Sequence, residues 1–464
     1  MALTSAVAWE VRTGGSDSNG GGYTVGAGGT DYSQQNAAQV VFNGSTITAT
    51  YKTGSSFTVT GYTVAATDVG NIVNITGGTG FTPGRYEVTT VNTSVNTWSV
   101  NAICCTTGAT GMTGRMGGGF LTIAQGIAAM TVSDQTIYVA SGTYNITSAL
   151  APSVTAGYYQ SSLIGYVTNH STIPTGSNRP LISTGSNAIN GITFSAATGW
   201  CLQNLIFSST SGGVIGISVG SNGTQISNCK VTGFASGIVT TNTGYVYNTE
   251  VMGCTIVGIS SNSGGNNCIM GCWVHDNTCV GIYLGGTSAQ NQVIDCLITN
   301  CTGASSDGIN YATNLGGATI VGNTIYGSGR DGIRLSATIS IATNIIVNNI
   351  ISNSSGYGIN VVTAQDHPVS ASINYNGYYS NTLGNTNNLN TGPNSIAMSA
   401  SPFNNPGGND FSLNSAAVGG LELKNAGFPS VMPGQTTPVG YPDIGVYRHQ
   451  DVTSVTNILN VLSS

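Results

Sequence analysis

The sequence has few charged residues, since Asp, Glu, Lys and Arg together make up only 6% of its 464 residues. Average soluble domains carry about 25%. The ten basic residues are scattered, and no Lys/Arg cluster is present that could follow a phosphate backbone. Disorder is typical of chains with high net charge and few aliphatic residues, whereas the net charge here is −6. The composition therefore argues against nucleic-acid binding and against a disordered chain.

Long apolar runs are also missing. No run approaches the roughly 18 residues that a membrane span needs, so we expect no membrane insertion. Residues 1–10 have neither the basic start nor the apolar stretch of a secretion signal. This predicts either that a signal has already been removed or that the protein leaves its producing cell by another route, such as lysis.

Glycine is abundant, with 67 residues, and Ser, Thr and Asn fill most gaps between apolar positions. Helices favour Ala, Leu, Glu and Lys, so this composition is not that of a helical protein. Short β-branched segments separated by Gly, Asn and Ser are typical of strands joined by tight turns. The composition therefore predicts an all-β protein.

An internal repeat organises the middle of the chain. A Gly-Ile dipeptide recurs eight times at intervals of 21 to 27 residues, with its glycines at Gly191, Gly216, Gly237, Gly258, Gly281, Gly308, Gly332 and Gly358. A second track of small polar residues lies between them, at Asn204, Cys229, Thr249, Cys272, Cys296, Asn323, Asn349 and Asn376. Each unit has too few strands to bury its own apolar face, so the units must stack at about 4.8 Å per coil. The two tracks predict a β-solenoid with internal aliphatic columns and an internal Asn/Cys/Thr ladder.

The flanking segments resemble a known superfamily. Residues 120–130 are typical of a short apolar helix, and residues 136–144 of a strand, a glycine turn and a second strand. Together with residues 409–413, they resemble the cap, first coil and final turns of pectate-lyase-like right-handed β-helix proteins. The resemblance covers about residues 120–447 and implies a right-handed parallel β-helix, which we expect to have about ten coils. It implies no single activity, because lyases, hydrolases, epimerases and inert fibres share this fold.

We expect three parts in the chain. Residues 1–119 lack the Gly-Ile period and contain alternating segments such as 46–50 and 57–60, which predicts an N-terminal β-rich attachment or capping domain. Residues 120–380 are predicted to form the β-helix, with a capping helix at 120–130 that protects the open sheet edge. Residues 381–464 are predicted to form an irregular C-terminal cap and tail.

Two N-terminal segments resemble viral proteins. Residues 9–23 are similar to the start of β-helix proteins from phages and environmental viral sequences. Residues 68–86 are similar to a small β module of predicted phage virion proteins. The resemblance implies a capsid decoration, spike or fibre on the virion surface. It also implies that the N-terminal domain contacts other virion proteins and that the protein is a homotrimer.

Asp307 and Asp331 are the candidates for catalysis. β-Helix enzymes that act on polysaccharides use a carboxylate pair or abstract a sugar proton beside an Arg or a Ca²⁺. Both residues directly precede a Gly-Ile dipeptide, so we expect them on neighbouring coils about 5 Å apart, a separation that suits a retaining pair. Arg330 and Arg334 are near them in the sequence, and Arg334 is a third catalytic candidate. The alternative, which we favour, is that they are solvated turn residues, because Asp before Gly is common in turns.

Four residues have the types and spacing of zinc ligands: Cys268, Cys272, His275 and Cys279. Cys272 also belongs to the internal track, and a straight coil does not bring side chains from opposite faces to one point. We therefore expect no metal and no other cofactor. We interpret the ten cysteines, including the adjacent Cys104 and Cys105, as core thiols rather than a disulfide framework.

Tyr375 and Tyr379 are candidates for stacking on sugar rings, because they cluster near the last coils. Three functions stay open. The favoured one is a bacteriophage virion protein with a host surface glycan as a candidate ligand. We expect it to be non-enzymatic because the sequence lacks a complete catalytic set. The alternatives are a polysaccharide-degrading tailspike, lyase or glycoside hydrolase that uses Asp307 and Asp331, and a bacterial surface adhesin.

Overall fold

The computed structural model describes residues 3–154, 161–195, 199–262, 266–286, 290–312, 317–336, 344–362, 372–428 and 443–446. By residue contacts the chain divides into two compact units, and each is described by itself. Unit 1 comprises Met1–Asn145, Leu150–Ile182 and Ala196–Leu205. Unit 2 comprises Ile146–Ala149, Ser183–Ser195 and Ile206–Ser464. Among the described residues, no helix is long and apolar enough to cross a membrane.

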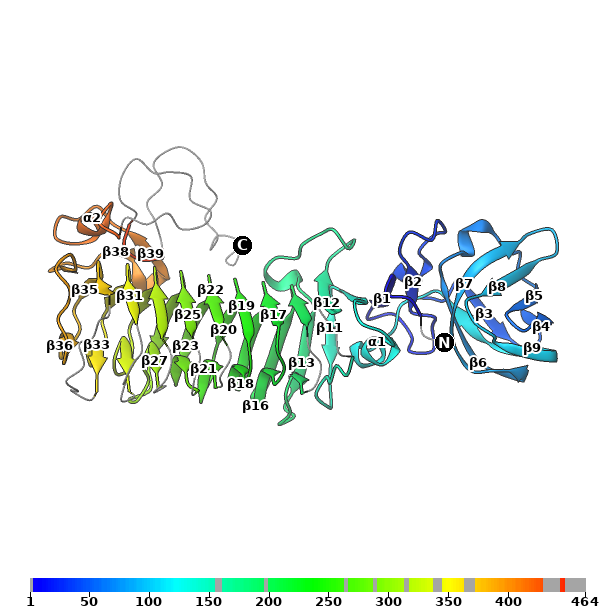
Figure 1. Cartoon of the computed structure of the whole chain (residues 1–464), viewed down its shortest axis with the longest axis horizontal. Coiled ribbons are helices and arrows are strands. Elements are labelled where there is room, and N and C mark those ends of the chain that lie inside the picture. The colour runs from blue at the N-terminus through cyan, green and yellow to red at the C-terminus, as the bar shows by residue number, and fades with distance from the viewer. Residues whose placement is uncertain are drawn as a thin grey trace. The chain divides into compact units, whose positions relative to one another are not determined.

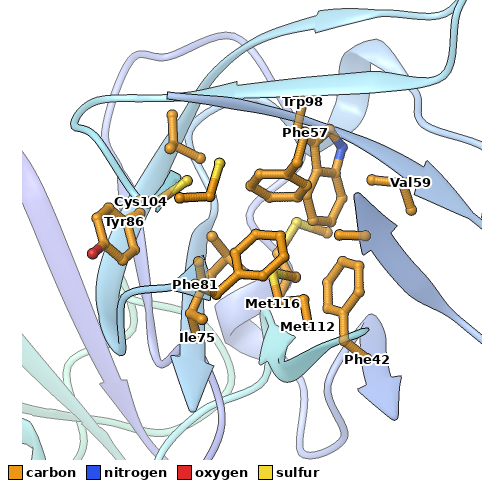
Figure 2. Packing of buried hydrophobic residues seen from close by; sticks show 14 of the residues in the cluster. Phe42, Phe57, Val59, Ile75, Phe81, Tyr86, Trp98, Cys104, Met112 and Met116 are labelled. Carbon is orange, nitrogen blue, oxygen red and sulfur yellow. The ribbon is translucent and has the colours of Figure 1, made fainter. Parts of the chain in front are cut away.

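Unit 1 contains a seven-stranded antiparallel sheet with the strand order β3-β9-β6-β7-β8-β5-β4. Its strands are β3 (Val40–Asn43), β4 (Thr48–Thr53), β5 (Ser56–Thr60), β6 (Ile72–Phe81), β7 (Gly84–Asn92), β8 (Thr97–Val100) and β9 (Cys105–Met116). Alternating apolar residues of these strands form a hydrophobic core, where Trp98 packs edge-on against Phe42 and Phe57 (Figure 2). The indole N–H of Trp98 donates a 3.0 Å hydrogen bond to buried Asp68. This part of unit 1 therefore has its own core.

A second sheet of unit 1 contains the first strands of the solenoid, in the order β2-β1-β10-β12-β15. They are β1 (Val7–Val11), β2 (Gly22–Thr24), β10 (Thr136–Ala140), β12 (Ser161–Tyr166) and β15 (Trp200–Gln203), and β11 (Thr143–Asn145) follows β10. β1 pairs in parallel with β10, and β2 is antiparallel to β1. A strand from the first twelve residues is thus part of the parallel ladder. The expected domain limit at residue 119 stays a prediction.

The predicted capping helix corresponds to α1 (Ile123–Ala129), whose first turn is capped by the hydroxyl of Thr122. Helix α1 lies beside β1 and β10 in unit 1. Buried Phe120, just before the helix, stacks on Trp9 of β1 with 5.8 Å between ring centroids. These contacts cover the apolar residues at the start of the parallel ladder.

Unit 2 is built from parallel strands that stack coil upon coil (Figure 1). One sheet contains β17 (Thr224–Ser227), β19 (Gly244–Tyr247), β22 (Cys268–Met270), β25 (Asn291–Ile294), β28 (Ala318–Val321), β31 (Ile345–Val347) and β34 (Ser372–Asn374). The other contains β14 (Ile192–Phe194), β16 (Ile206–Val219), β18 (Lys230–Thr240), β20 (Glu250–Met252), β21 (Val257–Ser261), β23 (Trp273–Asn277), β24 (Val280–Leu284), β26 (Leu297–Cys301), β27 (Ile309–Tyr311), β29 (Thr324–Tyr326), β30 (Ile333–Leu335), β32 (Ile350–Ser352), β33 (Tyr357–Val361), β35 (Gly377–Tyr379), β36 (Gly384–Asn387) and β37 (Ile396–Ala397). β13 (Leu181–Gly185) has residues in both units. The protein is a right-handed parallel β-helix of about nine turns, where the sequence predicted about ten.

The two predicted tracks form columns that run through unit 2, except for the first predicted member of the polar track. Ile206 pairs with Lys230, the residue directly after Cys229, so Asn204 was predicted one residue out of register with the rest of the track. The isoleucines of the Gly-Ile dipeptides pair in register from coil to coil and are fully buried: Ile192, Ile217, Ile238, Ile259, Ile282, Ile309, Ile333 and Ile359. The preceding glycines are required by a close approach between coils. A Cβ on Gly258, for example, would lie 2.5 Å from the carbonyl oxygen of Gly281, well inside contact distance.

The small polar track forms the predicted internal ladder. The side-chain amide of Asn323 donates to the Oδ1 of Asn349 at 2.9 Å, and Asn349 donates to Asn376 at 3.0 Å. All three are buried. Because each amide uses its neighbours as partners, the ladder satisfies buried polar groups along the stack. The cysteines of the same track, such as Cys296, are buried, and nine of the ten cysteines are buried free thiols, with Cys268 partly exposed.

A left-handed corner, which the repeat pattern did not predict, precedes this ladder. The residue just before seven of the eight predicted ladder positions has positive φ, as in Asn248, Asp295, Asn348 and the glycines Gly271 and Gly322, and Asn204 has positive φ itself. Asn, Asp and Gly tolerate this conformation best. Each coil therefore turns sharply here with residues suited to the bend.

The C-terminal segment folds back onto the outer face of unit 2. It contains the hairpin β38 (Phe403–Asn405) and β39 (Asp410–Leu413) and the short helix α2 (Gly420–Leu423). Its apolar side chains form a cluster with outward residues of the coils, comprising Leu297, Ile350, Met398, Phe403, Phe411, Leu413, Leu423 and Ile444. Trp273, Tyr326 and Tyr379 pack against it. The cluster thus covers the outer face of strands β26 to β35.

Candidate functional site

Asp307 is fully buried, and both of its carboxylate oxygens are occupied by donors from the protein. Arg330 binds it in bidentate fashion, from Nε to Oδ1 at 2.8 Å and from Nη2 to Oδ2 at 2.6 Å. The backbone N–H of Asp331 donates to Oδ1, and Asn310 donates to Oδ2. Burial raises the pKa of Asp307 above its ordinary value, although Arg330 opposes this shift. The carboxylate therefore links neighbouring coils.

Asp331 repeats this arrangement one coil further on. It is 1% exposed. Its Oδ2 accepts hydrogen bonds from Arg334 and from Asn360, both at 2.7 Å, and its Oδ1 accepts from the backbone N–H of Tyr357 at 2.9 Å. We call Asp307, Arg330, Asp331 and Arg334 the Asp307 ladder.

The structure thus brings Asp307, Asp331 and Arg334 together, as the sequence predicted, but it does not leave them solvated. A carboxylate that acts on a glycosidic bond must reach the substrate within hydrogen-bond distance. Both carboxylates of the Asp307 ladder are buried and are held by internal donors. The geometry favours a structural role over a catalytic one.

The structure does not gather the four zinc-ligand candidates at one point, although the partly exposed Cys268 of β22 lies near Cys272. Cys272 is buried in the internal ladder, and the thiol of Cys279 donates to the backbone carbonyl of Cys254. His275 lies on the outer face, beside Glu250 and Asp276. Within the described part of the chain, no three His, Cys, Asp or Glu side chains are grouped so that they could hold a metal ion. Burial raises the pKa of Cys279 to about 12, so this thiol stays protonated at neutral pH.

Tyr375 and Tyr379, the predicted glycan-stacking residues, contact the C-terminal segment. The ring of Tyr375 meets Phe428 edge-on, with 5.4 Å between centroids. Tyr379 packs against the cluster formed by the C-terminal segment. Both rings therefore contribute to holding this segment on the coils.

A polar cluster on the outer face of unit 2 was not among the predicted sites. Glu250 of β20 receives a 2.7 Å hydrogen bond from the ammonium of Lys230, on the preceding coil. The same oxygen lies 3.3 Å from Nε2 of His275, on the following coil. The other ring nitrogen, Nδ1, lies 2.8 Å from Asp276, and Trp273 stacks on the imidazole with 3.8 Å between centroids. We call these five residues the Lys230 cluster.

The Lys230 cluster is partly open to solvent. The side chain of Asp276 is 49% exposed and that of Lys230 is 30% exposed, whereas Glu250 and His275 are largely buried. Burial alone would raise the pKa of Glu250, but hydrogen bonds and charge from His275 and Lys230 outweigh it and bring the pKa below its ordinary value. The pKa of Asp276 is likewise lowered, because His275 and Asn300 outweigh its partial burial. Among the described residues, no hydrogen bond is donated to Oε2 of Glu250, and the Glu250 side chain is only 9% exposed.

The repeat could have revealed this cluster. Lys230, Glu250 and Trp273 each stand directly after a residue of the polar track, so they occupy the same position on three successive coils. His275 stands two residues after Trp273. Aligning the repeats by their outward positions would have grouped these residues without a structure.

Unit 1 contains a further polar network that the sequence could not have revealed. Glu10 of β1 is 1% exposed and accepts hydrogen bonds from Arg12 and from the hydroxyl of Tyr166. Its other oxygen lies 2.9 Å from Nε2 of His170, whose ring stacks on Tyr138. Burial and the nearby Glu10 raise the pKa of Tyr166, so its hydroxyl stays neutral and donates. The network ties β1 to β10 and β12.

The fold defines this chain as a member of the right-handed parallel β-helix class of proteins, and the comparisons with known proteins do not narrow it further. No protein-family model matches the chain, and no curated protein is significantly similar to it. The expected β-helix architecture is confirmed by the parallel ladders, whereas the phage resemblance stays a prediction.

Solved structures that resemble the chain include three polysaccharide-active proteins. The pectate lyase Pel9A has 14% identity and a TM-score of 0.42, over 72% of this chain and 92% of its own. A PL6 family polysaccharide lyase from Pseudopedobacter saltans has 13% identity and a TM-score of 0.40, over 62% of this chain and 79% of its own. The periplasmic alginate epimerase AlgG has 12% identity and a TM-score of 0.36, over 55% of this chain and 70% of its own. At these values the likenesses assign neither an activity nor a substrate to this chain.

Proposed function

We propose that this protein is a non-enzymatic structural component on the surface of a bacteriophage virion, with a host surface glycan as its ligand. The observation that best supports the non-enzymatic part is the complete pairing of Asp307 and Asp331. Enzymes of this fold class need carboxylates or bases that reach the polysaccharide. Here the two stacked carboxylates are used to join coils.

The organisation of the chain supports the structural part of the proposal. The seven-stranded sheet of unit 1 has its own hydrophobic core, which suits a module that attaches to other virion proteins. In unit 2 every coil adds backbone hydrogen bonds and one more layer to the internal columns. We further propose that the protein assembles as a homotrimer, in line with the fibres that its N-terminal segments resemble.

Labelling of particles tests the location. Purified phage particles would be probed with gold-coupled antibodies against the full chain, with particles lacking the gene as the control. We expect label on the capsid or tail of the wild-type particles only. A chain that is synthesised in infected cells but is missing from the particles would contradict the proposal.

One observation favours a second candidate function, the degradation of polysaccharide. The Lys230 cluster places a carboxylate beside an ammonium and an imidazole, which are groups used in general acid–base catalysis. In this alternative, Glu250 and His275 would move protons at a glycosidic linkage that lies across β18 to β23.

A turnover assay separates the two functions. The purified full chain would be incubated with capsular and pectic polysaccharides and with alginate, and reducing ends and unsaturated uronates would be measured. We expect no turnover. Turnover that is abolished by Glu250→Gln and retained by Asp331→Asn would establish degradation at the Lys230 cluster. Turnover lost in a stably folded Asp331→Asn variant would establish the Asp307 ladder as the site.

A further inference from the structure

Two tyrosines stand side by side on the outer face of β19. Tyr245 and Tyr247 are two residues apart in the strand, so they point to the same side of the sheet. Their rings are nearly parallel, with an interplanar angle of 15° and 6.2 Å between centroids. Both side chains are partly exposed, while Val246 between them is buried in the core. Neither hydroxyl forms a hydrogen bond with the described residues. We call this pair the tyrosine platform.

The strands on either side of the platform extend it with uncharged groups. By register, Gln225 of β17 lies beside Tyr245 on one side, and Gln292 of β25 lies two coils away on the other. Ser227 and Met270 flank Tyr247 in the same way, and Met270 is 39% exposed. Strands β17, β19, β22 and β25 contain no Asp, Glu, Lys or Arg. The face therefore offers aromatic rings, hydroxyls and amides without charge.

We propose that the tyrosine platform binds a neutral, hexose-containing glycan chain. Aromatic rings stack on the apolar faces of pyranose rings, while free phenol hydroxyls and side-chain amides match the sugar hydroxyls. An anionic polysaccharide is disfavoured, because these strands provide no cation to pair with its carboxylates. This inference depends on the proposed glycan-binding role and specifies both its site and its ligand class.

The geometry of the coils favours a polymer that follows the solenoid. Successive strands are about 4.8 Å apart, so a chain laid across β17, β19, β22 and β25 meets a new row of side chains at each coil. A protein partner fits less well, because a stable protein interface buries roughly 800 Å² per partner around an apolar core. The outward positions of this face instead mix amide, hydroxyl, aromatic and sulfur-containing side chains.

The test is affinity electrophoresis of the purified full chain through gels that contain dextran, soluble starch, a galactomannan or, as the anionic comparison, alginate. We expect retardation by at least one neutral polysaccharide. Tyr245→Ala and Tyr247→Ala should each weaken the retardation constant about tenfold, because each removes one stacking surface. The matched control is Tyr283→Ala, which removes a partly exposed tyrosine from β24, on the other sheet. It should leave binding unchanged.

The remaining outcomes separate this inference from the proposed function. Tyr245→Phe and Tyr247→Phe keep the ring and should retain most of the binding, and thermal melts would verify that every variant is folded. Equal retardation of wild type and both alanine variants would overturn the tyrosine platform while leaving the glycan-binding role in place. Retardation by alginate alone would overturn the neutral ligand class. No retardation by any polysaccharide would overturn the glycan-binding role as well, whereas the virion location is decided separately by particle labelling.

Discussion

The Asp307 ladder and the Lys230 cluster both connect neighbouring coils of unit 2 through a carboxylate, but they do so in different environments. In the Asp307 ladder, each carboxylate is buried and paired with Arg, Asn and backbone donors. In the Lys230 cluster, the Lys230 ammonium and the Asp276 carboxylate are partly exposed to water, whereas Glu250 is largely buried. The comparison teaches that acids on neighbouring coils can be fully paired with internal donors, so their stacking in the repeat does not by itself indicate function.

The strongest test of this comparison is the removal of one carboxylate from each group. Asp307→Ala leaves Arg330 without its bidentate partner and leaves the backbone N–H of Asp331 unpaired. We expect a loss of about 3 kcal/mol in the free energy of unfolding, as for other broken buried ion pairs. Urea denaturation, monitored by circular dichroism, would measure it.

The matched control is Asp276→Ala, in which a half-exposed carboxylate is removed from the Lys230 cluster. Its loss should be below about 1 kcal/mol, because water replaces the lost partner. Equal losses of unfolding free energy in the two variants would show that the burial of a carboxylate does not decide how much it contributes to stability.

The second test uses pH. The pKa of Asp307 is raised by burial, so the folded chain holds this proton more tightly than the unfolded chain, and the contribution of Asp307 to stability falls as pH rises through the folded pKa. The pKa of Glu250 is lowered, so its contribution is present above the unfolded value of about 4.5 and is lost as pH falls through the folded pKa.

Thermal melts between pH 3 and pH 7 would compare Asp307→Asn and Glu250→Gln with wild type. We expect the melting temperature of Glu250→Gln to differ least from that of wild type at the acidic end of this range. The melting temperature of Asp307→Asn should fall least below that of wild type when the pH is above the folded pKa of Asp307. The same pH profile for both variants would contradict the assigned directions of the two shifts.

The smallest expected effect concerns the exposed end of the Lys230 cluster. Lys230→Met removes the cation from Glu250 but keeps a stem that can cover the strand. We expect a change of about 0.5 kcal/mol that shrinks further in high salt, since the ammonium is exposed and screened. Melting temperatures at low and high sodium chloride would measure it. A salt-independent loss of more than about 2 kcal/mol in the free energy of unfolding would show that Lys230 contributes as a buried ion-pair partner, like the groups of the Asp307 ladder.

Much of the β-helix could be predicted because parallel stacking converts a sequence period into contacts. Residues at the same place in successive repeats pair with each other, so Ile238 on Ile259 and Asn323 on Asn349 follow from the period alone. The pairing of Asp307 with Asp331 through neighbouring coils followed in the same way. The period does not show how deeply a side chain is buried, so the burial of both carboxylates was not predicted.

Contacts without a repeat could not be predicted at all. The hydrogen bond from Tyr166 to Glu10 and the contact of His170 with Glu10 join residues more than 150 positions apart. The C-terminal segment also packs onto the outer face of unit 2 and contacts Tyr379 there. No sequence repeat predicts this contact. For these residues only the folded chain brings the groups together.

The sequence by itself determined the solenoid, its isoleucine columns and its asparagine ladder, because each coil repeats the pattern of the one below and in-register pairing leaves little choice. The tertiary structure decided which outward groups remain available. Donors from adjacent coils saturate Asp307 and Asp331, and the C-terminal segment covers one stretch of the outer face, while the Lys230 cluster and the tyrosine platform keep groups exposed. Availability depends on what packs around a side chain, and that is set by side chains of the neighbouring coils and, along one stretch, by the C-terminal segment.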